Sequence, residues 1–141
     1  MASGDFNKFN SFVTDLVNGV YTNLDTDVIK AMLSNTAPVA TNTVYANITQ
    51  IANGNGYTTG GVDISATYSE ADGVGTMGSA DYVEWTATGS MGPFRYVVLY
   101  DDTVASPAKP LIGWYDYGAS LTLAASEKFR VDFGANILTI S

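Results

Sequence analysis

Phe94-Arg95-Tyr96-Val97-Val98-Leu99-Tyr100 is the stretch of this chain that most strongly indicates its fold. The run is apolar on both faces except at Arg95, and strands buried on both faces carry such continuous apolar runs. Asp101-Asp102 ends it. The stretch therefore predicts a central β-strand that is covered by protein on both sides.

Further strands are predicted before and after this run. Turn signals rich in glycine, proline and asparagine separate them at intervals of about 8–12 residues, which is typical of a sandwich or barrel. Residues 71–79 contain three glycines and are expected to be a turn region. The other expected strands are 28–33, 62–69, 82–87, 111–117, one starting at Leu121, 128–133 and 137–140. The predicted fold class is mainly β, a compact antiparallel β-sandwich or barrel-like domain.

The N-terminal third carries helical periodicity. Apolar residues recur there at spacings of three and four, which predicts an amphipathic helix at roughly residues 5–18. We therefore expect the segment 1–22 to be helical and to form an arm that contacts other subunits or a capsid. Val44, Ile48 and Ile51 predict a second short helix. At 141 residues, the chain is expected to be a single domain, 1–141.

The absence of histidine and cysteine narrows the possible chemistry. Histidine is the commonest general base, and both residue types dominate zinc sites and nucleophilic triads. We therefore predict that the protein is not an enzyme and has no catalytic, cofactor-binding or metal site.

Two acidic motifs are candidate sites. Asp101-Asp102 favours a strand-terminating turn, because neighbouring strand residues point to opposite faces and would not share a site. Asp25-Thr26-Asp27 resembles the opening of a calcium loop, but the later glycine and glutamate of an EF-hand are missing. A turn is favoured there too, and a calcium site of another type stays open.

The glycine-rich segment 54–61 lacks the lysine and the following helix of a phosphate-binding loop, so we expect a turn with several positive φ angles.

Charge argues against two classes of partner. Six basic and 14 acidic residues give a net charge of −8, and the cations are scattered along the chain. Phosphate groups and anionic membranes both require clustered Lys and Arg. We therefore expect no nucleic-acid or membrane partner. No apolar run reaches the ~20 residues of a membrane span, and we expect no signal peptide.

Several segments in order resemble small virion proteins of tailed bacteriophages, namely the capsid decoration (cement) proteins. The resemblance runs from about Leu24 to the end. It lies in Asp25-Thr26-Asp27 with Ile29-Lys30-Ala31-Met32-Leu33, Gly56-Tyr57-Thr58-Thr59-Gly60-Gly61, Val83-Glu84-Trp85, Arg95 to Asp102, Pro110-Leu111-Ile112-Gly113 and Asp116-Tyr117-Gly118. It implies a homo-oligomer, for which we expect a homotrimer, bound to the major capsid protein on the outer surface of the virion. Synthesis is expected in the host cytoplasm.

Low charge and abundant aromatic residues also suit an interface core, where charges are depleted. The residues expected at an oligomer or capsid interface are Phe6, Phe9, Phe12, Trp114, Tyr115 and Tyr117. The three phenylalanines span more of a helix than one docking face needs, so one ring is expected to reach a neighbour. Two alternatives stay open. The first is another virion part, such as a tail or head–tail protein. The second is a sugar-binding β-sandwich with Trp85, Trp114 and Tyr115 in an exposed row.

Overall fold

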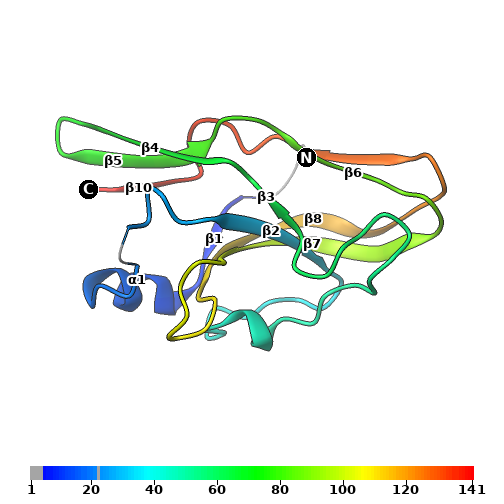
Figure 1. The fold of residues 1–141 in the computed structure, drawn as a ribbon, viewed down its shortest axis with the longest axis horizontal. Helices are drawn as coiled ribbons and strands as arrows, with labels where there is room; N and C mark the ends of the chain where they lie inside the picture. Colours follow the sequence, from blue (N-terminus) through cyan, green and yellow to red (C-terminus); the bar gives the residue numbers. More distant parts are fainter. Residues whose placement is uncertain (1–4, 22) are drawn as a thin grey trace.

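Three antiparallel sheets make up most of the protein in a computed structural model, which describes residues 5–21 and 23–141 (Figure 1). Strand residues make up 46% and helical residues 8%, so the predicted mainly-β sandwich class is confirmed. The five-stranded sheet has the order β1 (Asn7–Lys8), β8 (Leu111–Leu123), β7 (Met91–Asp101), β2 (Ile29–Ser34), β3 (Val62–Asp63). The three-stranded sheet has the order β10 (Leu138–Ile140), β5 (Val74–Ser79), β4 (Ala66–Ala71). The two-stranded sheet pairs β6 (Val83–Thr86) with β9 (Lys128–Val131).

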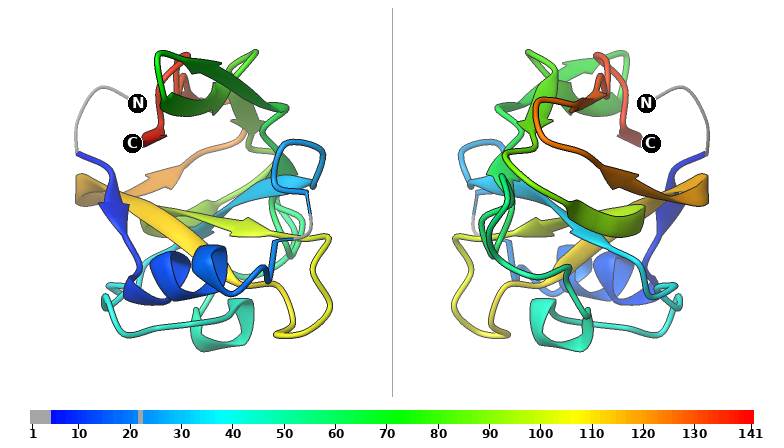
Figure 2. Two further views of the ribbon diagram at one scale, coloured as in Figure 1. Left: turned by 90° about the vertical axis from the view of Figure 1, so that its left-hand side faces the viewer. Right: turned by 90° about the vertical axis from the view of Figure 1, so that its right-hand side faces the viewer.

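The molecule has layers on both sides of the five-stranded sheet. The two smaller sheets cover one face, while α1 (Asn10–Val17), the single turn η1 (Tyr45–Asn47) and the loops cover the other (Figure 2). The strand β7 lies third of five, between β8 and β2. Its residues Val97 to Tyr100 are fully buried, because both faces of this strand are covered. The prediction of a central strand is therefore confirmed.

The N-terminal segment differs from its prediction. The helix covers Asn10–Val17 only, and Asn7 and Lys8 instead pair with Trp114 and Gly113 as an edge strand. The Phe6 ring lies against Gly113, where a Cβ atom would come within 2.3 Å of it. Strand pairing across this glycine therefore overrides the local helical periodicity. Residues 1–4 and 22 of the predicted segment lie outside the described residues.

The second predicted helix is reduced to the turn η1. The Asn47 Oδ1 atom accepts hydrogen bonds from the backbone N–H groups of Thr43 and Val44. The chain then turns to β2, where the Ile51 N–H donates to the Leu33 carbonyl. Pairing with β2 thus ends the helical turn.

Residues 71–79 form most of a β-hairpin rather than a turn region. The turn itself is Asp72-Gly73, and both residues have positive φ, as a tight hairpin turn requires. Gly75 lies under the Tyr68 ring, and Gly78 lies against the backbone of Ala135. These two glycines therefore allow close packing inside a strand. Composition alone does not distinguish such a glycine from one in a turn. The predicted strand 62–69 is also divided, because Ser65 has a positive φ between β3 and β4.

Candidate functional site

The structure brings most of the predicted interface residues together, but within one subunit. The Phe6 ring packs on Tyr115 at a centroid distance of 5.6 Å, and the Phe9 ring packs on Trp114 at 4.6 Å. Trp114 and Tyr115 are successive residues of β8, so they point to opposite faces of the sheet. The N-terminal segment therefore wraps the edge of the sheet and places one ring on each face.

Burial corrects the interface expectation for two of these residues. Phe9 is fully buried and Phe12 is 3% exposed, with its ring on Tyr21 at 5.5 Å. Both rings are part of the subunit's own core and are closed to a partner. Phe6 is half-buried against Tyr115 and keeps part of its ring at the surface. Contact of one ring with a neighbour therefore stays a prediction for Phe6 alone, since Phe6 and Phe9 precede the helix instead of lying on it.

The three β8 aromatic residues are half-buried and hold the layers together. Tyr115 contacts Phe133 at 5.7 Å, and Tyr117 contacts Phe129 at the same distance. Both partners come from the segment that follows β8, on the side of the smaller sheets. These contacts assign Tyr115 and Tyr117 a packing role, with part of each ring left at the surface.

The exposed row of a sugar-binding surface is not formed. Trp85 is 3% exposed and packs on Phe129 at 6.0 Å. Trp114 and Tyr115 lie on opposite faces of the sheet, as their contacts with Phe9 and Phe6 require. These three rings therefore offer no common flat face for a sugar ring.

An open apolar groove lies instead between α1 and β10, two elements at the same end of the molecule (Figure 1). Its volume is about 410 Å³. The helix leaves Val13 and Val17 exposed at 46% and 79%, and β10 leaves Ile140 exposed at 38%. The groove is lined by Lys8, Phe12, Val13, Leu16, Val17, Leu138, Thr139, Ile140 and Ser141.

Two rows of apolar side chains on α1 explain this groove. Phe12 and Leu16 are one row at i and i+4 and turn toward the protein, while Val13 and Val17 are the next row and turn outward. A surface helix needs only one apolar stripe. The adjacent pairs Phe12-Val13 and Leu16-Val17 show in the sequence that this helix has a second apolar row. The prediction instead attributed the additional apolar surface to the phenylalanine rings.

The groove differs in charge from the rest of the surface. Lys8 is the one charged side chain among the described residues that line it, in a chain of net charge −8. Elsewhere, carboxylates lie in ion pairs, such as Asp116 with Arg95 at 2.8 Å and Glu84 with Arg130 at 3.1 Å. An apolar surface with few charges is the composition of an interface core.

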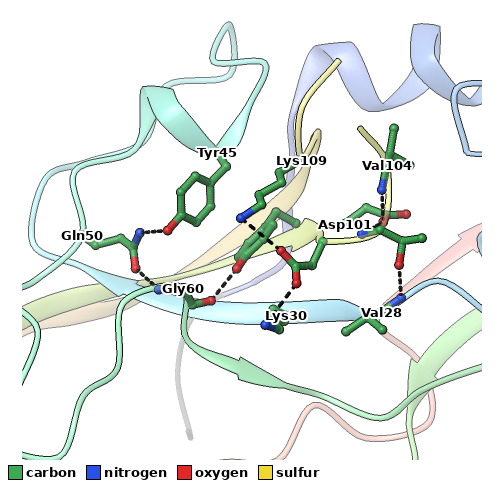
Figure 3. Close-up of polar contacts among 11 residues, drawn as sticks. Val28, Lys30, Tyr45, Gln50, Gly60, Asp101, Val104 and Lys109 are labelled. Carbon is green, nitrogen blue, oxygen red and sulfur yellow. Dashed lines mark hydrogen bonds and ion pairs between the residues drawn. The ribbon is translucent and has the colours of Figure 1, made fainter. Parts of the chain in front are cut away.

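The glycine-rich segment is a turn whose N–H groups bond within the protein. The Gly60 N–H donates to the Gln50 Oε1 atom at 2.8 Å, and the Tyr100 hydroxyl donates to the Gly60 carbonyl (Figure 3). The Gln50 amide in turn donates to the Tyr45 hydroxyl at 2.6 Å. The Gly61 N–H donates to the Thr58 carbonyl. These contacts fix the segment against β2 and β7.

The two acidic motifs meet in the structure. Asp102 points to Lys30 and Lys109, at 3.1 and 3.4 Å (Figure 3). Asp101 points the other way, and its carboxyl group interacts with that of Asp27. Asp101 and Asp102 thus point apart, as the sequence predicts. The pair Asp27–Asp101 was missed, because it takes one residue from each motif and the two motifs are far apart in the chain.

The described part of the chain contains no group of three or more acidic, histidine or cysteine residues placed to hold a metal ion. Its helices include none that is long and apolar enough to cross a membrane.

Comparison with known proteins gives no relatives: no family model, curated protein or solved structure matches this chain. The resemblance to capsid decoration proteins therefore rests on the residue patterns alone.

Proposed function

We propose that this protein is a structural virion component that decorates a phage capsid. In this role it binds the outer surface as a homo-oligomer, a trimer, and bridges major capsid subunits. The observation that carries the proposal is the open apolar groove between α1 and β10. It provides an apolar surface for protein contact, on which Lys8 is the one charged side chain among the described residues.

The groove has the properties of an anchoring site for a partner side chain. Binding energy in protein interfaces concentrates in a few apolar or aromatic anchors that fill such hollows. Val13, Val17 and Ile140 are exposed around this one, and covering them removes apolar area from water. The strand β10 pairs with β5 along its length, which holds this wall of the groove in place. A partner would therefore meet a preformed surface.

Capsid binding tests the proposal directly. Val17→Asp places a charge on the most exposed apolar residue of the groove, and burying an unpaired charge is costly. We expect the variant to fold normally and to bind assembled capsids of the cognate major capsid protein at least about tenfold more weakly in co-sedimentation.

The control is Tyr82→Asp. Tyr82 is 50% exposed and directly precedes β6, which lies at the other end of the molecule from α1 (Figure 1). This variant is expected to bind as the unchanged protein does. Absence of the chain from purified virions, or its localisation to the tail by electron microscopy, would contradict the proposal. Light scattering measures the oligomeric state.

A further inference from the structure

The carboxyl groups of half-buried Asp27 and fully buried Asp101 lie where two loops meet. Asp101 is the last residue of β7 and is fully buried. Asp27 precedes β2, in the connection that follows α1. The two loops also share backbone contacts. The Val28 N–H donates to the Thr103 hydroxyl at 2.9 Å (Figure 3). The Asp102 N–H donates to the Val28 carbonyl. The pair and these contacts therefore join residues 27–28 to residues 101–103.

Each carboxyl group has one buried oxygen that receives no N–H or O–H donor from the described residues. The Asp101 Oδ1 atom accepts hydrogen bonds from the backbone N–H groups of Thr103 and Val104, at 2.8 and 3.2 Å. The Oδ2 atoms of Asp101 and Asp27 are both buried and lack such a partner. A buried carboxylate oxygen without a donor is costly, and a proton held between the two groups removes this cost for both.

The charged groups around the pair add no compensating cation. Lys30 of β2 and Lys109 of the β7–β8 loop both bind Asp102, whose side chain points away from the pair. The Tyr21 hydroxyl, in the connection after α1, interacts with both carboxyl groups of the pair and with Asp15 of α1. Asp15 is a further carboxyl group, and the Tyr21 hydroxyl donates to the Leu111 carbonyl. Two ionised carboxylates would therefore repel each other in a buried place.

The pKa of Asp101 agrees with this geometry. Burial, followed by the hydrogen bond to Asp27, raises the pKa of Asp101 to about 7. The Thr103 and Val104 N–H groups oppose this rise but do not cancel it. A carboxyl group beside a like charge keeps its proton to a higher pH than either would alone.

We propose that Asp27 and Asp101 form a proton-dependent latch, in which one shared proton fastens the α1–β2 connection to the β7–β8 loop. Loss of that proton as pH rises leaves two facing charges and loosens both loops. A cavity of about 280 Å³ lies beside the pair, lined by Val20, Asp27 and residues 103–106, and it gives the loops room to part. The latch stands independently of the proposed capsid role.

The sign of the pH effect follows from linkage. The folded protein holds a proton that the unfolded chain, with an ordinary aspartate, releases near pH 4. Between about pH 4 and 7, the folded state therefore binds more protons than the unfolded state, and stability falls as pH rises through this window.

The variant Asp27→Asn tests the latch, because its amide donates a permanent hydrogen bond to Asp101 in place of the shared proton. We expect the unfolding temperature of the unchanged protein to fall by at least about 5 °C between pH 5 and pH 8. Asp27→Asn is expected to lose at least half of that fall. Hydrogen exchange, corrected for its intrinsic pH dependence, should show faster opening of peptides 20–28 and 102–109 at pH 8 in the unchanged protein only.

The matched control is Asp63→Asn. Asp63 also accepts a backbone N–H two residues ahead, from Ser65 at 2.8 Å, but it is exposed, so this variant removes the same charge without touching the pair. It is expected to keep the full pH dependence. The proposal is overturned if Asp63→Asn and Asp27→Asn behave alike, or if carboxyl ¹³C shifts show both Asp27 and Asp101 titrating near pH 4. It is also overturned if calcium chloride raises the unfolding temperature of the unchanged protein but not of Asp27→Asn, since the pair would then hold a cation.

Discussion

At the scale of single residues, backbone conformation decides what several glycines do. Gly19 and Gly61 both have positive φ, of 72° and 79°. Their surroundings differ: a Cβ atom at Gly61 would lie 1.8 Å from the Ala31 carbonyl oxygen, whereas nothing lies within 4 Å at Gly19. Gly61 therefore allows β3 to approach β2, and Gly19 only allows the chain to leave the helix.

These two glycines give a matched pair of substitutions. Gly19→Ala adds the strain of a left-handed conformation and is expected to cost about 1 kcal/mol of unfolding free energy. Gly61→Ala adds the same strain and a collision with fixed backbone, so we expect a loss of at least about 3 kcal/mol. Urea unfolding of both variants measures the difference. Equal losses would show that the backbone of β2 yields freely at this point.

At the scale of elements, α1 is held by what precedes it. The helix has eight residues and carries no side-chain hydrogen bond at its N-cap, Phe9. A helix this short is unstable alone, so packing must hold it in place. The Phe9 side chain packs on Trp114, and its N–H donates to the Ile112 carbonyl at 3.1 Å. Phe9 thereby ties the start of the helix to β8.

The variant Phe9→Ala removes this anchor. Deleting a buried phenylalanine leaves a cavity, and the usual cost is about 3–5 kcal/mol. We expect a loss in this range in chemical denaturation, with the helical signal in circular dichroism reduced. Val17→Ala, on the exposed side of the same helix, should change stability by less than about 0.5 kcal/mol. A small loss for Phe9→Ala would show that the helix is held from elsewhere.

At the scale of the whole molecule, buried tyrosine hydroxyl groups lower the stability of the fold at alkaline pH. Burial raises the pKa of Tyr115 to about 12. Burial is also the main cause of the raised pKa values of Tyr21, Tyr57 and Tyr100, with a further contribution from Asp15 at Tyr21. In the unfolded chain these phenols ionise near pH 10. Above that pH the folded state binds more protons, so stability falls as pH rises.

An alkaline titration tests this limit. The protein has nine tyrosines. We expect the four named phenols to ionise in a late step that coincides with loss of the β-sheet signal in circular dichroism. In denaturant, all nine should ionise together near pH 10. Ionisation of all nine phenols with the sheet signal intact would contradict the prediction.

The sequence by itself determined the mainly-β class and the central strand. The run from Phe94 to Tyr100 is apolar on both faces, and a local pattern of this kind reports burial directly. The opposite directions of the Asp101 and Asp102 side chains were also predictable from local sequence, because adjacent side chains of a strand point to opposite faces. These features depend on residues that are neighbours in the chain.

Only the tertiary structure decided features that depend on distant neighbours. Phe6 and Phe9 have helical spacing, but pairing of Asn7 and Lys8 with β8 keeps this stretch extended. Phe12 and Val13 are both apolar, and only docking of the helix decides that Val13 faces the groove. The pair Asp27–Asp101 joins residues far apart in the chain, and the meeting of their buried Oδ2 atoms, rather than either motif, makes them share a proton. Side-chain periodicity records which residues avoid water, but it does not record which segment covers them.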